Sequence, residues 1–264
     1  MSADWLAVCR AATEDVQDVL AELPTRAERE PVVGDGVGGD ETTAVDAAAE
    51  RVILERLRAI DGATIVSEEV GELRGNGRLR IVVDPIDGSL NAKRGIPFFS
   101  ISVAIADGET MDDVLFGYVH DFGTGEEWTA ERGKGARLNG AELSELRPKE
   151  EIEILSFEAT LTSSVAEKAA AMVGVAYRLR IMGSLALSLC HLAAGRVDAV
   201  CSLKAARAVD IAAAQLLVRE RGLAIDLPEA PPFGSAPLDT QGRSRVVAAA
   251  TPDVCARLFA ALSR

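Results

Sequence analysis

Residues 79–89 read LRIVVDPIDGS. The apolar half of this stretch has the pattern of a buried β-strand, and Pro85 cannot extend a central strand because it has no N–H donor. The strand is therefore predicted to stop at Asp84, where the chain turns. Asp84 and Asp87 could bring two carboxylates to one point, with the Ile86 carbonyl between them, and hard cations prefer such oxygens. Alternatively, the segment is an ordinary Asp-Pro turn with a solvated second aspartate.

Two further acidic positions follow the same pattern. A β-branched run at 63–67 ends in Glu68 and Glu69, so two neighbouring strands, parallel or antiparallel, could present acids at one sheet edge. Asp210 stands at the start of an apolar helix pattern. Taken singly, the first is compatible with a solvated loop and the second with a helix cap. Only the combination of these acidic positions predicts a site.

The composition limits the class of protein. The chain has 264 residues, 48% of them hydrophobic, in runs that never approach the ~18 apolar positions of a membrane span. Its N-terminus lacks the basic flank and apolar stretch of a secretory signal, so a cytoplasmic location is expected. The net charge of −13 disfavours nucleic acid and anionic membranes as partners. An anionic substrate would need bound cations or a local basic pocket.

The cysteines and histidines predict packing rather than chemistry. The cysteines are Cys9, Cys190, Cys201 and Cys255. Because they have no CxxC spacing, we expect reduced, buried thiols. His120 and His191 stand alone in apolar or mixed segments. Neither a zinc site nor Ser-His-Asp chemistry is expected.

Hydrophobic periodicity predicts the elements of the fold. The first part should contain helices at 3–22 and 43–60, strands at 63–67, 79–83, 100–106, 114–121 and 126–131, and a turn at 138–140. The second part should alternate through strand 152–157, helix 163–173, strand 176–181, helix 184–194, strand 197–203, helix 208–221, strands 223–227 and 244–250, and helix 252–263. Such alternation implies layered α/β packing. We expect one unit with a metal-binding lobe at 1–147 and an α/β lobe at 148–264.

Several ordered blocks of sequence carry a further signal. They are GDETTAVD at 39–46, SEE at 67–69, VDPIDGSLN at 83–91 with GIP at 95–97, GKGA at 133–136 with NG at 139–140, GSLA at 183–186 and VDIAA at 209–213. In this order and spacing they resemble the inositol monophosphatase family, and within it the archaeal-type enzymes that also act as fructose-1,6-bisphosphatases. The resemblance covers nearly the whole chain. It implies a mixed α/β fold, layered as the α-β-α-β-α sandwich of sugar phosphatases.

The resemblance implies bound Mg²⁺, for which Mn²⁺ could substitute. The implied ligands are Glu68, Asp84, Ile86, Asp87 and Asp210 for two ions, and Asp40 for a looser third. Asp84 would bridge the first two ions. Such ions orient an attacking water and stabilise the leaving oxygen, and they explain how an acidic protein could bind a phosphate.

The same resemblance implies catalytic and substrate-binding residues. Asp46 and the Ser89 hydroxyl would position and deprotonate the water, and Glu68 would assist through the metal. Substrate contacts are implied for Asp87, Gly88, Ser89, Gly183, Ser184 and Leu185. From their placement near strand ends, Arg180, Lys204 and Arg207 are expected to bind a distal phosphate. No covalent phosphoenzyme is needed.

Departures from the family pattern bear on the substrate. Ser89 stands in place of the commoner Thr, Val209 in place of Trp, and Leu203 in place of the Glu of inositol-specific members. We therefore expect a phosphomonoesterase for sugar or polyol phosphates, with fructose 1,6-bisphosphate first and inositol 1-phosphate second. The resemblance further implies a homodimer. Alternatives within the family are a dedicated inositol-1-monophosphatase and a phosphatase for NADP or 3′-phosphoadenosine 5′-phosphate.

Two alternatives lie outside this activity. A non-catalytic, metal-binding scaffold would keep the fold without the reaction. Haloacid-dehalogenase-like phosphatases also carry an acidic motif after a strand, but with one residue between the two aspartates. Two residues, Pro85 and Ile86, separate them here, so a nucleophilic aspartate is not expected.

Overall fold

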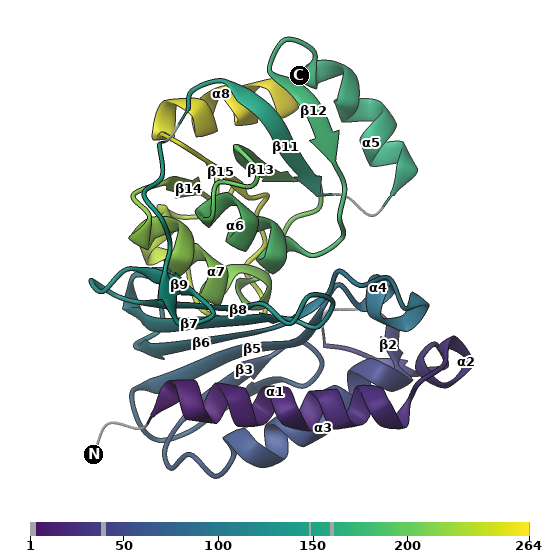
Figure 1. Cartoon of the computed structure of the whole chain (residues 1–264). Helices are drawn as coiled ribbons and strands as arrows, with labels where there is room; N and C mark the ends of the chain where they lie inside the picture. The colour runs from purple at the N-terminus through teal and green to yellow at the C-terminus, as the bar shows by residue number, and fades with distance from the viewer. Residues whose placement is uncertain (1–3, 38–40, 148, 159–160, 264) are drawn as a thin grey trace.

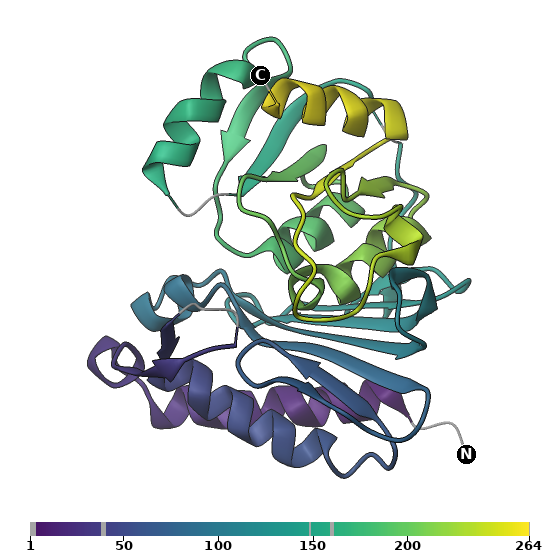
Figure 2. The ribbon, with the colours of Figure 1, turned by 180° about the vertical axis from the view of Figure 1, so that it is seen from behind.

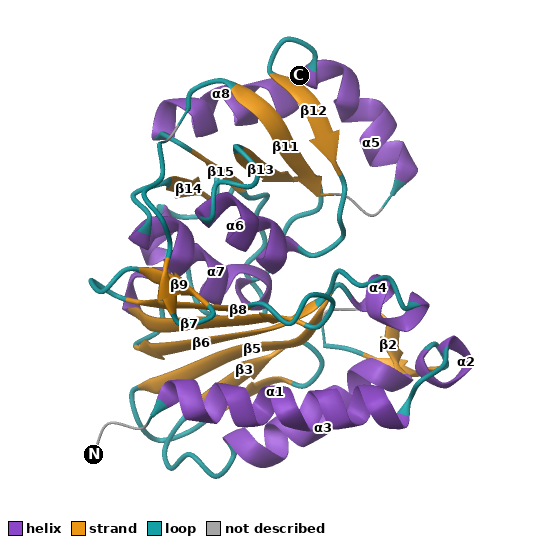
Figure 3. Ribbon diagram, viewed as in Figure 1, coloured by secondary structure: helices purple, strands orange, loops and turns teal. Residues whose placement is uncertain are grey.

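A computed structural model of the chain describes residues 4–37, 41–147, 149–158 and 161–263. Helices and sheets alternate in layers (Figures 1 and 3). From one side to the other these are α1 (Trp5–Glu22) with α3 (Ala44–Leu57), a first sheet, α6 (Leu185–Ala193) with α7 (Ala208–Glu220), a second sheet, and α5 (Thr162–Ala169) with α8 (Pro252–Leu262). The expected α-β-α-β-α sandwich is confirmed.

The first sheet has eight strands in the order β10-β9-β8-β7-β6-β5-β3-β4. They are β3 (Thr64–Ser67), β4 (Gly71–Leu73), β5 (Leu79–Asp87), β6 (Ser100–Asp107), β7 (Val114–Asp121), β8 (Glu127–Glu131), β9 (Ala136–Leu138) and β10 (Ala141–Glu142). Strands β3 and β5 are parallel, and Ser67 lies opposite Val83. The residues that follow, Glu68 and Asp84, therefore emerge at the same edge of the sheet.

The prediction that the strand stops at Asp84 is wrong. Strand β5 continues to Asp87, but its register with β6 shifts after Asp84, which lies opposite Ser102, whereas Asp87 lies opposite Ser100. Pro85 thus occupies a β-bulge, where the ladder is interrupted and a missing N–H costs no hydrogen bond. The bulge re-aims the carboxylate of Asp87.

The second sheet has the order β12-β11-β13-β15-β14. Its strands are β11 (Ile152–Glu158), β12 (Ala176–Arg180), β13 (Ala199–Ser202), β14 (Ala224–Asp226) and β15 (Val247–Ala249). Helices α6 and α7 belong to a core cluster that also contains residues of the first sheet, so the two halves share their packing. The alternation expected in this half is confirmed, and the lobe boundary near residue 147 stays a prediction.

Several short elements were missed by the periodicity, which needs longer windows. They are α2 (Arg26–Arg29), β1 (Val32–Asp35), β2 (Glu41–Thr43), β4, and 3₁₀ turns at Met111–Asp113, Ala170–Met172 and Phe233–Ser235. Helix α4 (Ser89–Arg94) begins directly after Gly88. Strands β1 and β2 form a small antiparallel sheet beside α3. The predicted turn at 138–140 is confirmed, because Asn139 and Gly140 both have positive φ angles between β9 and β10.

The cysteines and histidines pack as expected. All four cysteines are buried and free, and burial raises the pKa of the Cys190 thiol well above its ordinary value. His120 and His191 contact aromatic rings, Phe122 for the first and Phe98 and Trp128 for the second. In the part of the chain that the structure describes, no helix combines the length and apolarity needed to cross a bilayer.

Candidate active site

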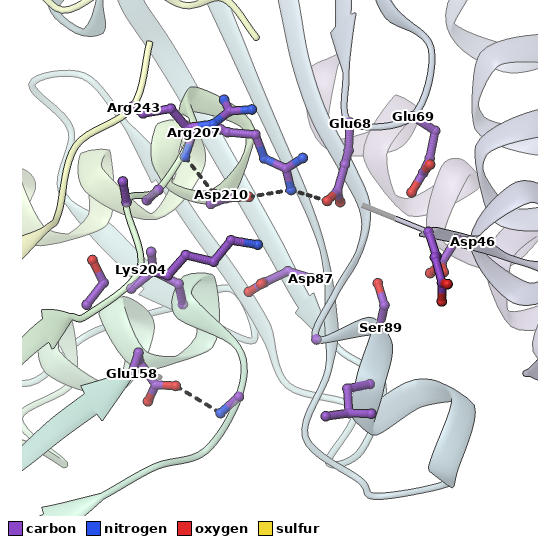
Figure 4. A pocket seen from close by; sticks show the side chains of 18 residues that line it. Asp46, Glu68, Glu69, Asp87, Ser89, Glu158, Lys204, Arg207, Asp210 and Arg243 are labelled. Carbon is purple, nitrogen blue, oxygen red and sulfur yellow. Dashed lines mark hydrogen bonds and ion pairs between the residues drawn. The ribbon is translucent and has the colours of Figure 1, made fainter. Parts of the chain in front are cut away.

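A cavity of about 350 Å³ opens where β3, β5, β11 and β13 end and α4, α6 and α7 begin (Figure 4). Its lining combines both charge signs. The carboxylates are those of Glu41, Asp46, Glu68, Glu69, Asp87, Glu158 and Asp210, and the cationic side chains are those of Lys204, Arg207 and Arg243. Strand ends and helix starts from both halves of the chain thus converge on one polar space, a placement typical of ligand sites in α/β folds.

The β5 bulge positions the two aspartates differently. Asp84 is 2% exposed, and its Oδ1 accepts the N–H of Ile86 at 3.0 Å. It lies behind the cavity wall. The Oδ2 of Asp87 accepts the Ser184 hydroxyl at 2.5 Å and the Ala186 N–H at 2.8 Å. Asp87 therefore links the first sheet to the start of α6, and its carboxylate reaches the cavity.

Three acidic groups of the site, Glu68, Asp84 and Asp87, have raised pKa values. Burial raises the pKa of Asp87 to about 7, and Asp210 adds to the rise. Burial likewise raises the pKa of Glu68 to about 7, although Arg207 opposes the shift. For Asp84, burial followed by the charge of Glu68 raises the pKa well above its ordinary value. Such a group of carboxylates is stable in its charged form only beside a cation.

In this structure the neighbouring cation is Arg207. Its Nη2 contacts Glu68 Oε1 and lies 3.5 Å from Asp210 Oδ1, and the three side chains point toward one another in Figure 4. Among the described residues, no three His, Cys, Asp or Glu side chains are grouped closely enough to hold a metal ion. Glu68 and Asp210 share the guanidinium instead.

Asp46 and Ser89 lie on the same cavity wall but have different partners. Asp46 Oδ2 accepts the N–H and hydroxyl of Thr43 at 3.2 and 2.5 Å, forming a capping box at the start of α3. Its other oxygen, Oδ1, is buried and has no hydrogen-bond partner in the structure. The Ser89 hydroxyl donates to the Ile86 carbonyl at 3.0 Å. Their joint role stays a prediction.

The donor set fits Mg²⁺. Every predicted ligand in the described part of the chain supplies an oxygen, as hard divalent cations require. The unpartnered Asp46 Oδ1 is a buried acceptor that needs a water or a cation. The raised pKa values of Asp84 and Asp87 indicate carboxylates that a bound cation would hold ionised. Asp40, predicted to hold a third ion, lies outside the described residues.

Most of the predicted substrate-binding residues line the cavity, but Ser184 and Arg180 do not. Gly88, Ser89, Gly183, Leu185, Lys204 and Arg207 line the cavity with Asp87. Ser184 lies behind the wall, buried and bonded to Asp87. Arg180 is absent from the lining. It is exposed on β12 and donates to the carbonyl of Leu179 at 2.9 Å.

Arg243 and Glu158 are charged lining residues that the sequence analysis did not identify. Arg243 reaches the cavity from the loop after residue 228, and Nη1 donates to the Thr240 carbonyl at 2.8 Å. Glu158, at the end of β11, accepts the N–H of Gly183 at 2.9 Å. No local pattern marks Arg243. The abrupt polar end of the apolar run at 152–157 could have indicated Glu158, as it did for Glu68.

Comparison with known proteins identifies the relatives of the chain. The family model described as the inositol monophosphatase family matches residues 5–263.

The chain belongs to this family.

Two relatives are both named fructose-1,6-bisphosphatase/inositol-1-monophosphatase. The one from Thermococcus kodakarensis is 33% identical over 84% of this chain and 83% of the relative. The one from Archaeoglobus fulgidus is 33% identical over 93% of each. A crystal structure described as an inositol monophosphatase–fructose 1,6-bisphosphatase matches with a TM-score of 0.84 and 27% identity, covering 98% of this chain and 100% of the other.

Membership of the inositol monophosphatase family determines the class of activity. The chain is a phosphatase, an enzyme that hydrolyses phosphate esters of small molecules. Members of the family depend on a metal ion, generally Mg²⁺. The cavity that holds Asp87 and Glu68 is therefore the candidate active site of this inositol monophosphatase family member.

Proposed function

We propose that this phosphatase uses Mg²⁺ to hydrolyse sugar and polyol phosphates, fructose 1,6-bisphosphate first and inositol 1-phosphate also. One observation carries the proposal: acidic and cationic side chains share a single cavity. Glu68 and Asp87 lie on its wall together with Lys204 and Arg243. Carboxylates suit the metal ions, and the cations suit the phosphate groups of the substrate.

The metal ligands follow from the carboxylates that converge on the cavity. We assign Glu68, Asp84, Asp87, Asp210 and the Ile86 carbonyl to two Mg²⁺ ions, with Mn²⁺ as a substitute and a third ion near Asp40. When bound, the ions supply positive charge that orients water and stabilises the leaving oxygen. The protein's part is to hold these oxygens together against their own repulsion.

The proposed reaction is a direct attack of water on phosphorus. The P–O bond to the substrate oxygen breaks, that oxygen takes up a proton from solvent, and Asp46 returns to solvent the proton that it accepts. The unpartnered Oδ1 of Asp46 is available to accept the proton that the attacking water loses, and the Ser89 hydroxyl would orient that water from the same wall. The N–H groups of Gly88 and Ser89, at the start of α4, would hold the phosphate oxygens.

The cationic residues favour a substrate with a second phosphate. Lys204 extends toward Asp87 in Figure 4, and Arg243 lies farther along the same wall. Leu203, which replaces an acidic residue of inositol-specific members, packs against the core of the second sheet. A dedicated inositol-1-monophosphatase, a nucleotide phosphatase and a non-catalytic scaffold remain the alternatives. We also propose a cytoplasmic homodimer that does not bind nucleic acid.

Phosphate release from four substrates tests the proposal: fructose 1,6-bisphosphate, inositol 1-phosphate, NADP and 3′-phosphoadenosine 5′-phosphate. We expect the highest kcat/KM with the first, dependence on Mg²⁺, and comparable release from the second. If the protein hydrolyses neither of the first two substrates, the substrate assignment is overturned. If the protein hydrolyses none of the four, the result supports the alternative of a non-catalytic, metal-binding scaffold.

The substitution Asp87→Asn tests the metal assignment. We expect kcat/KM to fall at least about 100-fold, because losing a charged ligand removes several kcal/mol of charge stabilisation. The asparagine oxygen can still accept from Ser184 and Ala186, so the fold should persist. The control is Asp121→Asn, another buried aspartate at the end of β7, where its Oδ1 accepts the Gly123 N–H at 2.8 Å. Activity that survives in Asp87→Asn would refute the assignment.

A further inference from the structure

The guanidinium of Arg207 occupies the space between two predicted metal ligands. Its Nη2 contacts Glu68 and lies 3.5 Å from Asp210, so the guanidinium stands between the two carboxylates in Figure 4. The three side chains are only 11%, 17% and 18% exposed. This is therefore a largely desolvated ion triad rather than a surface salt bridge.

Such an arrangement has a clear physical purpose in the absence of metal. A buried carboxylate without a counter-charge is strongly destabilising, and here Glu68 and Asp210 lie near Asp84 and Asp87, which are buried more deeply. Arginine is the side chain best suited to bridge two carboxylates, because its planar group presents several donors and keeps its charge when buried. Arg207 supplies the missing positive charge.

The same oxygens cannot serve both cations. A Mg²⁺ ion held by Glu68, or the second ion held by Asp210, would lie beside the guanidinium, and like charges at such separations repel strongly in a partly buried site. The metal must therefore displace the Arg207 side chain from the two carboxylates. Metal binding and the triad compete.

We propose that Arg207 is a built-in counter-cation that holds Glu68 and Asp210 when no metal is bound, gives way when Mg²⁺ enters, and so sets the affinity of the site for the metal. The proposal rests on the metal site of the proposed function. Its geometry permits the exchange, because the backbone of Arg207 stays anchored while the side chain moves. The Arg207 N–H donates to Asp210 Oδ2 at 2.7 Å, capping α7.

The displaced guanidinium would remain in the active site. Arg207 lines the cavity beside Arg243 (Figure 4), so its released donors would face the space where we place the substrate phosphate. Metal occupancy would then create a phosphate-binding group at the same time as it completes the metal site.

The test is the Mg²⁺ affinity of Arg207→Gln after all metal has been removed with a chelator, measured by isothermal titration calorimetry. We expect Mg²⁺ to bind roughly tenfold more tightly than to the wild type, because the competing cation of a desolvated pair is gone. The matched control is Arg243→Gln, which removes the same charge from the same cavity but not from the triad. We expect its Mg²⁺ affinity to change less than about threefold.

A second readout separates this role from substrate binding. Without metal, Arg207→Gln should melt at a lower temperature than the wild type, and saturating Mg²⁺ should remove the difference. Unchanged or weaker Mg²⁺ binding in Arg207→Gln, or an equal gain in Arg243→Gln, would overturn the proposal. So would a rise in the KM for substrate with no change in metal affinity, which would make Arg207 a substrate contact only.

A measurement on the wild type covers the case in which the variant does not fold. The side-chain Nε–H resonance of Arg207, assigned with Arg207→Lys, should shift when Mg²⁺ is added and return when it is chelated. A resonance that does not respond, in protein that calorimetry shows to bind Mg²⁺, would refute the exchange alone. Wild-type protein that binds no Mg²⁺ would refute the proposed metal site and this inference together.

Discussion

Glu68 and Asp87 are acids whose surroundings favour the neutral form. Burial raises both pKa values to about 7 from ordinary values of 4.5 and 3.8. An unfolded chain loses these protons at lower pH than the folded chain does. Between those limits the folded state holds more protons, so its stability falls as the pH rises.

This sign gives a prediction for the metal-free protein. Thermal melting in the presence of a chelator should show the melting temperature falling between about pH 4.5 and 7, with each kcal/mol lost lowering it by about 2–4 °C. Saturating Mg²⁺ holds the carboxylates ionised, so the fall should shrink or vanish. A chelated protein whose melting temperature rises across this window would contradict the raised pKa values.

Lys204 and Arg180 are both basic, but only Lys204 lines the cavity. Both were predicted to contact a distal phosphate, yet Lys204 lines the cavity and Arg180 lies exposed on β12. We expect Lys204→Gln to raise the KM for fructose 1,6-bisphosphate about tenfold, since a charge-assisted contact is lost. Arg180→Gln should leave it within about twofold. Steady-state kinetics on both variants measures the two KM values. A larger rise in KM for Arg180→Gln than for Lys204→Gln would show that Arg180 contacts the distal phosphate, as the sequence predicted.

At the scale of elements, two turns bring β5 and α6 together. Gly88 ends β5 with a φ of 97°, and Gly183 precedes α6 with a φ of 89°. A Cβ on Gly183 would lie 3.0 Å from Nδ2 of Asn91. That amide cannot easily move, because it donates to the carbonyls of Phe98 at 2.7 Å and Met182 at 2.8 Å.

Gly183→Ala should therefore combine backbone strain with a steric conflict. We expect the free energy of unfolding to fall by about 2–3 kcal/mol, with reduced activity because the cavity wall shifts. Gly133→Ala is the control: its φ is 74°, but nothing lies within 4 Å of the added Cβ, so we expect about 1 kcal/mol. Urea denaturation measures both. Equal losses would show that the contact with Asn91 does not matter.

At the scale of the whole molecule, the loop at 228–243 joins the two halves. It descends from the second sheet to the edge of the first (Figure 2), where Leu238 N–H donates to the Glu109 carbonyl at 2.7 Å. Arg80 of β5 donates to the Leu238 carbonyl at 3.0 Å. Its side chain is 9% exposed and also faces Glu72 and Glu109. The same loop carries Arg243 to the active site.

Arg80→Met should loosen this junction. We expect the free energy of unfolding to fall by about 2–4 kcal/mol, because a buried carbonyl and a carboxylate lose their charged donor. Arg78→Met, two residues earlier, removes an ion pair with Asp107 whose arginine is 79% exposed, and should cost less than about 1 kcal/mol. Chemical denaturation of both proteins compares them. A small loss in Arg80→Met would mean that other contacts hold the loop.

Most of the fold could be predicted from local sequence patterns. The periodicity of α1 and α3 and the β-branched runs of β3 and β5 appear in the chain itself, since one buried face imposes a repeat on neighbouring residues. The acids at the ends of β3 and β5 were equally visible. The continuation of β5 past Asp84 was not visible, because whether a proline stops a strand or enters a bulge depends on the partner strand, β6.

The content of the active site depended on contacts between distant residues. Arg207 and Glu68 are 139 positions apart, and no local pattern shows that a guanidinium lies between the acids. The loop with Arg243 enters the cavity, whereas Arg180 lies exposed on β12, the edge strand of the second sheet. The sequence thus identifies the acids and the fold that carries them. Which oxygens are free, and which cations face them, follows from packing between the two halves of the molecule.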